Sequence, residues 1–245
     1  MPAPRRATDG EEMLVWERPE PPSRPAPSPL SRERIVRAAI EIADAHGLGS
    51  VSLRKVAAAL DAGPMRLYGY LSTKEELLDL MVDAAYGEIT PPEPTGADWR
   101  ATLRSIAHLT RQAVRRHEWF ADLLGGRPHL GPNALAYLEA SLAALDGAPG
   151  FDDIDSVMQA VGTVHAYVVG AVRGEITELR AERSTGMDER QWQIASGPYL
   201  GRMLATGRFP TLAKVVEHAA HADADTAFDT GLDYVLDGIA TRLTG

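Results

Sequence analysis

Residues 52–74 read Ser-Leu-Arg-Lys-Val-Ala-Ala-Ala-Leu-Asp-Ala-Gly-Pro-Met-Arg-Leu-Tyr-Gly-Tyr-Leu-Ser-Thr-Lys and carry the clearest structural signal in the chain. Leu53, Val56 and Leu60 recur at the spacing of one apolar face of an α-helix. The Asp-Ala-Gly run that follows breaks this periodicity. Pro64 then suits the first position of a new helix, because the N–H that proline lacks would have no partner there. The stretch therefore predicts a helix, a tight turn and a second short helix.

The second short helix is expected to expose a basic and aromatic face. Leu67 and Leu71 are the positions well placed to face inward. The side chains left facing solvent are those of Met65, Arg66, Tyr68 and Tyr70. A purely structural explanation would need four separate burial sites on one short helix. Such a face is typical of an element laid into a groove of DNA.

Motifs on either side extend this pattern. They are Arg34-Ile35-Val36-Arg37-Ala38-Ala39, the helix end Ala45-His46-Gly47-Leu48, the run 51–57, Leu67-Tyr68, and Lys74-Glu75-Glu76-Leu77-Leu78. With these motifs in this order, the span 31–83 resembles the DNA-binding domain of the tetracycline-repressor (TetR) family of transcriptional regulators. It departs from the family in the turn, where Asp61-Ala62-Gly63 stands in place of a Gly-Val-Ser-like sequence.

The resemblance implies which side chains contact DNA. Arg54 matches a position that reaches a base edge, where a guanidinium can pair with guanine through two hydrogen bonds; the alternative is an ordinary surface arginine. Lys74 matches a position that touches phosphate, and the N-terminus of its helix attracts the same anion. The other expected phosphate contacts are Ser52 and Tyr68. The expected sequence readers are Pro64, Met65 and Arg66, with Tyr70 against a sugar or a thymine methyl group.

Composition favours a soluble protein built from two modules. At 245 residues the chain exceeds the ~100–200 residues of a typical domain. It has no cysteine, which excludes disulfides and thiolate metal sites. No apolar run approaches the ~20 residues of a membrane span, and no apolar segment follows the N-terminal arginines as in a secretory signal. We therefore expect a cytoplasmic protein without membrane contact.

The net charge of −9 is unevenly distributed. Residues 30–80 carry seven basic and seven acidic side chains, whereas residues 81–245 carry 14 and 22. A neutral DNA-binding head on an acidic body should bind non-specific DNA weakly. It would depend on a few placed contacts and on dimerisation.

Proline and glycine mark the boundaries between segments. Residues 1–29 are rich in proline and are expected to form a flexible arm; the alternative is an arm docked on the protein or on DNA, for which Met13-Leu14-Val15-Trp16 offers the apolar contact. Residues 30–90 are expected to form the DNA-binding domain, with its helix-turn-helix at 52–71. Residues 91–245 are expected to form the ligand-binding and dimerisation domain.

The predicted fold is all-α, with about ten helices. Ser31 and Thr73 are expected N-caps of the first and fourth helices, and Gly47 is expected to end the first. The N-terminal domain is a three-helix head with the helix-turn-helix, and the larger domain is a helical bundle. The expected helices of the latter are 97–117, 119–124, 131–145, 152–182, 188–205, 210–219 and 223–243.

Small residues on the longest predicted helix indicate a close helix crossing. They recur every four residues and so form one smooth ridge that a second helix can approach closely. They are Gly162, Ala166, Gly170 and Gly174. The last helix carries a similar stripe that includes Gly231 and Val235. The family resemblance implies a four-helix dimer interface built from two such helices of each subunit; the alternative is that the ridge packs inside one subunit.

Scattered polar and aromatic residues are candidates to line a ligand pocket, since such pockets are mostly apolar with a few placed polar groups. They are His108, Trp119, Tyr137, Met158, Thr163, His165 and Tyr167. We expect a largely apolar effector, bound without metal or cofactor. In tetracycline-binding members of the family a metal-coordinating histidine precedes a Leu-Gly-Thr-Arg-Pro turn, and Leu123 stands at that position here.

No catalytic motif supports an enzyme: the chain has no Gly-x-Ser-x-Gly elbow and no phosphate-binding loop. The sequence thus predicts a homodimeric repressor that binds a palindromic operator and is released by a small molecule. The alternative is a helical ligand-binding or scaffold protein without operator binding.

Overall fold

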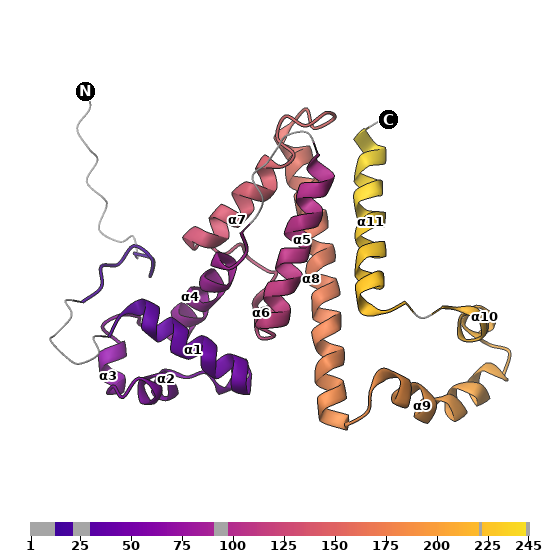
Figure 1. The fold of residues 1–245 in the computed structure, drawn as a ribbon, viewed down its shortest axis with the longest axis horizontal. Helices are drawn as coiled ribbons and strands as arrows, with labels where there is room; N and C mark the ends of the chain where they lie inside the picture. Colours follow the sequence, from indigo (N-terminus) through magenta and orange to yellow (C-terminus); the bar gives the residue numbers. More distant parts are fainter. Residues whose placement is uncertain (1–12, 22–29, 91–97, 221, 244–245) are drawn as a thin grey trace. The chain divides into compact units, whose positions relative to one another are not determined.

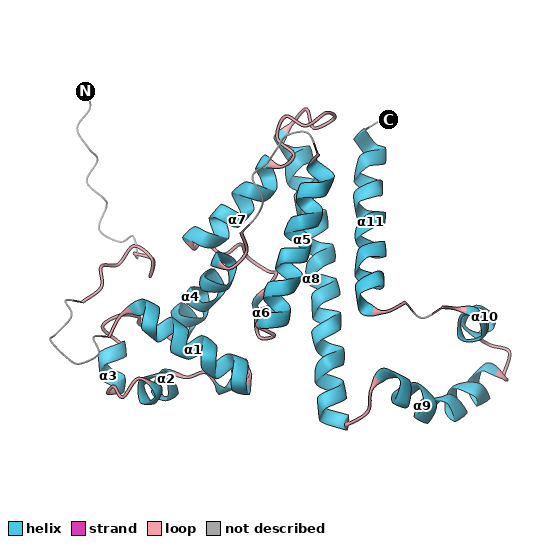
Figure 2. Ribbon diagram, in the orientation of Figure 1, coloured by secondary structure: helices cyan, strands magenta, loops and turns pink. Residues whose placement is uncertain are grey.

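The computed structural model describes residues 13–21, 30–90, 98–220 and 222–243. Within these ranges the chain forms eleven α-helices and one 3-10 helix and contains no strand (Figures 1 and 2). The all-α prediction is therefore confirmed. Contacts divide the chain into two compact units, one from residues 1–91 and 116–140 and the other from 92–115 and 141–245. The domain boundary between residues 90 and 91 stays a prediction.

The first unit contains the predicted DNA-binding head. Its helices are α1 Arg32–His46, α2 Leu53–Ala59, α3 Pro64–Leu67, α4 Lys74–Gly87, α6 Phe120–Leu123 and most of α7 Pro132–Ala143, with the 3-10 helix Leu48–Ser50 after α1. The Ser31 hydroxyl accepts a hydrogen bond from the Arg34 N–H at 3.2 Å, and the Thr73 hydroxyl accepts one from Glu76 at 3.1 Å. Gly47, at φ 76°, ends α1 in a conformation that favours glycine. Both predicted caps and the predicted helix end are confirmed.

A buried carboxylate joins α4 to α7 inside the first unit. Asp83 is buried, and its Oδ1 accepts hydrogen bonds from the backbone N–H groups of Asn133 and Ala134, both at 2.9 Å. These N–H groups belong to the first turn of α7, where they have no partner within the helix. The Asp83 side chain of α4 thus accepts hydrogen bonds from the free N–H groups at the N-terminus of α7.

A second polar cluster surrounds the buried imidazole of His117, which follows α5 Trp99–Arg116. Its Nδ1 lies 2.9 Å from Asp44 Oδ1, and its Nε2 lies 3.1 Å from Glu88 Oε1. Arg116 also pairs with Glu88. Burial raises the pKa of the Glu88 carboxyl, but hydrogen bonds and charge from Arg116 and His117 outweigh it and lower the pKa below its ordinary value. The cluster connects α1, the end of α4 and the residues after α5.

The second unit is built on the long helix α8 Ile154–Thr185, with α5 Trp99–Arg116 and α11 Ala224–Leu243 (Figure 1). The valines that flank the small-residue ridge are buried, namely Val157, Val161, Val164, Val168 and Val172. Helix α11 packs along α8. Helices α9 Glu189–Leu204 and α10 Pro210–His218 contribute no buried residue. Each of these elements lies within a few residues of its predicted range.

The N-terminal segment is partly packed on the head. Residues 13–21 are described, and Val15 is buried. Leu14 and Glu17 close a turn through a backbone hydrogen bond of 3.0 Å. Residues 13–21 are thus docked on the head, which is the alternative to the expected flexible arm. Residues 1–12 and 22–29 lie outside the described ranges.

Candidate nucleic-acid interface and ligand region

Helix α2 begins at a capped serine and exposes two cations. The Ser52 hydroxyl accepts a hydrogen bond from the Lys55 N–H at 3.2 Å, so this side chain serves as the N-cap of the helix. Val56 and Ala57 are buried, whereas Arg54 and Lys55 are exposed. The turn after the helix passes through Asp61, which has a positive φ of 50°. The side chain of Arg54, in the first turn of α2, is therefore presented to solvent.

Helix α3 rests on two leucines and exposes the side chains around them. Leu67 and Leu71 are buried, as predicted. Met65 is 80% exposed and Tyr68 50% exposed, and Pro64 and Arg66 are exposed as well. Because a methionine so exposed gains nothing from the protein interior, this face is suited to contact another molecule.

Tyr70 does not face solvent, and the prediction that it does was wrong. The residue is 8% exposed, and its hydroxyl donates a hydrogen bond of 2.8 Å to the backbone carbonyl of Leu30. Helix α3 ends at Leu67, so helical periodicity does not determine the direction of a side chain three residues later. Tyr70 instead fixes the turn after α3 to the residues before α1.

Lys74 is the first residue of α4 and is partly exposed. It follows Thr73, whose hydroxyl caps the helix. The exposed residues of α2, the exposed face of α3 and Lys74 come from three consecutive elements of one unit. We call this set, made of Arg54, Pro64, Met65, Arg66, Tyr68 and Lys74, the recognition face.

The predicted pocket residues are divided between the two units. Trp119 and Tyr137 belong to the first unit, and the other five belong to the second. Trp119 is 1% exposed, and its indole N–H donates a hydrogen bond of 2.7 Å to Asp44, so it is a core residue of the head. Met158 and Thr163 are exposed on α8. The pocket prediction was therefore wrong for Trp119, because the sequence did not show that the core of the head covers this side chain. For Met158 and Thr163 it stays a prediction.

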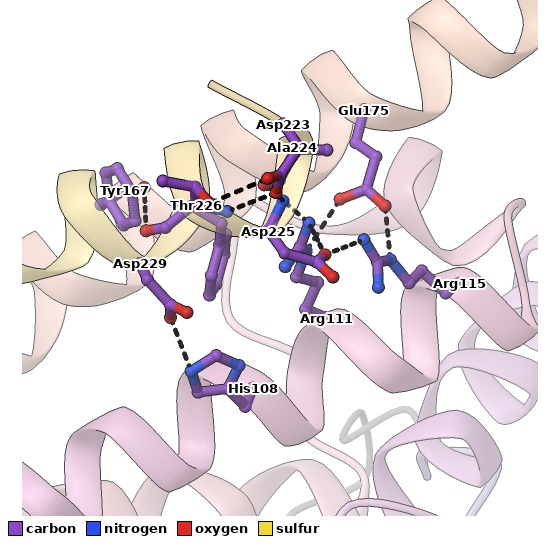
Figure 3. Close-up of polar contacts among 11 residues, drawn as sticks. His108, Arg111, Arg115, Tyr167, Glu175, Asp223, Ala224, Asp225, Thr226 and Asp229 are labelled. Carbon is purple, nitrogen blue, oxygen red and sulfur yellow. Dashed lines mark hydrogen bonds and ion pairs between the residues drawn. The ribbon is translucent and has the colours of Figure 1, made fainter. Parts of the chain in front are cut away.

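Two pocket candidates on α8 are partly buried. Burial lowers the pKa of the His165 imidazole, which favours its neutral form. The Tyr167 hydroxyl donates a hydrogen bond of 2.7 Å to the backbone carbonyl of Phe228 on α11 (Figure 3). A β-carbon at Gly231 would lie 2.4 Å from that hydroxyl oxygen. Gly231 therefore accommodates Tyr167 inside the chain, and its place in the dimer interface stays a prediction.

The small-residue ridge of α8 is uncovered by the rest of the described chain. A β-carbon at Gly162, Gly170 or Gly174 would meet no described atom within 4 Å. Ala166, on the same ridge, is exposed, and Val235 on α11 is partly exposed. The alternative of packing inside one subunit is thus not what the described residues show.

Sequence reasoning missed a ladder of ion pairs between α5 and α11. Arg100 pairs with Asp237, Arg104 with Asp233, and His108 Nε2 lies 2.9 Å from Asp229 Oδ1. The signal was present in the sequence as basic residues on α5 and aspartates every four residues on α11. Only the fold shows that the two series face each other.

The ladder ends at a buried arginine (Figure 3). The Arg111 side chain is 5% exposed and pairs with Glu175 at 2.8 Å and Asp225 at 2.9 Å. Its guanidinium also lies 4.5 Å from the centre of the Phe228 ring. Arg115 pairs with the same two carboxylates. Buried charge of this kind is tolerated only when it is fully paired, so this end of the ladder depends on all of its members.

An open groove of about 540 Å³ runs beside the ladder along α5. It is lined by Asp98, Arg100, Ala101, Arg104, Ser105 and His108. His108 is the predicted pocket residue that lies in it. Within the described ranges no cluster of histidine and acidic side chains is arranged to hold a metal ion. Among the same residues, every helix is too short or too polar to span a bilayer.

Comparison with known proteins identifies the family. The model of the tetracyclin repressor-like, C-terminal domain matches residues 90–243. HTH-type transcriptional repressor DrrR1 of Streptomyces coeruleorubidus is 39% identical over 227 residues, which cover 92% of this chain and 83% of that protein. This chain belongs to the tetracycline-repressor (TetR) family of transcriptional regulators.

Solved structures agree with this assignment. The crystal structure of apo ActR from Streptomyces coelicolor matches at a TM-score of 0.74 and 26% identity, covering 89% of this chain and 99% of that one. ActR in complex with (S)-DNPA matches at a TM-score of 0.72 and 26% identity, covering 87% and 98%. The resemblance noted for residues 31–83 thus extends over most of the chain.

Proposed function

We propose that this protein is a cytoplasmic, dimeric repressor that binds a palindromic operator through the recognition face and releases it when a small molecule binds. The observation that carries this proposal is the recognition face itself. Arg66, Met65 and Tyr68 are exposed around two buried leucines, and Arg54 and Lys74 add cations on either side. The repressor DrrR1, to which the chain is 39% identical, supports the direction of regulation.

Dimerisation would use the uncovered ridge of α8. A ridge of small residues lets two helices approach closely, which increases the van der Waals contact between them. The exposed Met158 and Ile154 on the same helix would add apolar area to that contact. A dimer with two-fold symmetry presents two recognition faces and therefore selects a palindromic site.

The effector would act in the second unit without catalysis, metal or cofactor. The (S)-DNPA complex of ActR supports a small-molecule effector in this family. For this chain we retain a largely apolar molecule with one or two hydrogen-bonding groups. His108, His165 and Tyr167 would be its polar contacts. A coupling energy of about 1–3 kcal/mol would lower operator affinity by roughly 5–150-fold.

The decisive experiment is a mobility-shift titration with tiled fragments of the DNA that flanks the gene of this protein. The protein should bind one fragment as a dimer at nanomolar concentration, and its affinity should depend steeply on salt. His165→Ala should keep this binding and lose the response to the effector. A protein that binds no fragment, yet binds small molecules, would instead be the helical ligand-binding or scaffold protein.

A further inference from the structure

The docked N-terminal segment places one arginine, Arg18, in contact with two parts of the head. Arg18 Nη1 donates a hydrogen bond of 2.8 Å to the Ser72 hydroxyl, and its Nη2 pairs with the Glu76 carboxylate. The carbonyl oxygen of Arg18 accepts a hydrogen bond of 2.9 Å from Arg32 Nη2. The side chain thus joins the segment to the start of α4, while its backbone joins it to the start of α1.

Neighbouring residues hold Arg18 in this place. The Glu20 carboxylate accepts a hydrogen bond of 3.2 Å from the Arg32 N–H. Val15 is buried, which fixes the segment before Arg18. A β-carbon at Gly69 would lie 3.3 Å from Pro21 Cγ, so the segment passes close over the turn that follows α3. The segment is therefore attached on both sides of Arg18.

The partners of Arg18 also join the residue before the N-cap of α4 to the first turn of that helix. The Glu76 carboxylate also accepts a hydrogen bond of 2.6 Å from the Ser72 N–H. Burial raises the pKa of Glu76, but the hydrogen bonds from Arg18 and Ser72 and the charge of Arg18 outweigh it and lower the pKa. Glu76 and Ser72 lie on either side of Lys74 in sequence and close the loop that begins at Tyr68. Tyr68 and Lys74 both belong to the recognition face.

We propose that Arg18 is a positioning residue for DNA recognition, acting through Ser72 and Glu76 on the placement of Tyr68 and Lys74. This inference rests on the proposed operator binding. Loss of Arg18 would leave the Glu76 carboxylate without its cation and release the segment from α4. The loop between α3 and α4 would then sample more conformations, and operator binding would have to order it again.

The test measures operator affinity of the full-length protein over a series of salt concentrations. The probe is the flanking DNA fragment that the parent protein binds. Arg18→Ala should weaken binding about tenfold, with an unchanged slope of affinity against salt, because no phosphate contact is lost. Glu76→Gln should also weaken binding, although it removes a negative charge next to DNA. In the Glu76→Gln background, Arg18→Ala should cost less than about threefold.

Arg37→Ala is the matched control. It removes the same charge from the head, where Arg37 makes an exposed ion pair with Glu33 one turn away on α1. Its effect should stay below about twofold. Thermal unfolding shows whether each variant is folded. If Arg18→Ala does not fold, the operator affinity of Glu76→Gln tests the inference in its place.

Three results would overturn the inference. The first is operator affinity unchanged in Arg18→Ala or Glu76→Gln. The second is a salt slope that falls by about one per subunit in Arg18→Ala and is restored by Arg18→Lys, which would make Arg18 a direct phosphate contact. The third is a parent protein that binds no flanking fragment, which would refute the proposed function as well. Parental binding with an unaffected Arg18→Ala variant would refute this inference alone.

Discussion

Replacing Gly231 with alanine should destabilise the second unit, and the structure gives the reason. The new β-carbon would lie 2.4 Å from the Tyr167 hydroxyl oxygen and 2.8 Å from two atoms of its ring. Tyr167 is not free to swing away without loss, since its hydroxyl donates a hydrogen bond of 2.7 Å to the Phe228 carbonyl. Overpacking of this kind costs about 1–3 kcal/mol, and a lost hydrogen bond about 1 kcal/mol.

Gly238, seven residues later on the same helix, provides the control. A β-carbon there would meet nothing within 4 Å. Gly238→Ala should therefore gain the helix propensity of alanine, about 1 kcal/mol, without a clash. Gly231→Ala gains the same propensity, so the difference between the variants isolates the clash with Tyr167. We expect it to be about 2 kcal/mol.

For a protein of this size, such a difference separates the two midpoints of thermal unfolding by about 4–8 °C. Circular dichroism during a temperature ramp measures it, and light scattering at low temperature reports the oligomeric state. Equal midpoints for the two variants would refute the packing of Tyr167 on Gly231. A Gly231→Ala variant that unfolds like the Gly238→Ala control but is monomeric would place Gly231 in the dimer interface and not against Tyr167.

Other variants test the head, the dimer and the acid response. Arg54→Ala should cost about 1–3 kcal/mol of operator binding and relax the preference at one base pair of each half-site; Lys74→Ala should weaken all sequences alike and reduce the salt slope by about one per subunit, both measured by anisotropy titration. Gly170→Leu should yield helical monomers with greatly reduced operator affinity, and a dimer seen by light scattering would contradict the role of the ridge. The lowered pKa of Glu88 stabilises the head above the ordinary carboxyl pKa of 4.5, and this contribution is lost as pH falls through the lower pKa of the folded state. Glu88→Gln should therefore be less stable than the parent at neutral pH and approach it in acid, as urea titrations at both pH values would show.

Local signals in the sequence predicted the elements well. Ser31, Thr73 and Pro64 mark helix starts through interactions within three or four residues, and such signals do not depend on the rest of the fold. Leu67, which lies within α3, was correctly placed inside for the same reason. Tyr70 was misplaced because its direction depends on a carbonyl group 40 residues earlier in the chain, at Leu30.

The misjudged residues share a dependence on distant partners. The spacing of small residues predicts a close approach but not the group that approaches, and the sequence did not show that Tyr167 of the same chain lies against Gly231. The apolar run 13–16 indicated a docked arm as an alternative, and Val15 is buried, but nothing in the segment before residue 30 indicated the contacts of Arg18. Arg18 meets Ser72 and Glu76, more than fifty residues later, and no local pattern reports such a pair.

The ladder between α5 and α11 has a consequence for how the two helices are aligned. Its aspartates, at positions 225, 229, 233 and 237, are evenly spaced, and Arg100, Arg104 and His108 follow the same interval. Equal rungs attract one another equally well after a slide of one helical turn, so charge alone leaves the register ambiguous. Arg111 breaks the interval, since it lies three residues after His108, and its buried guanidinium is placed over the Phe228 ring and donates to the Ala224 carbonyl. The evenly spaced pairs therefore hold α11 against α5, and the contacts of Arg111 determine which helical register the two helices adopt.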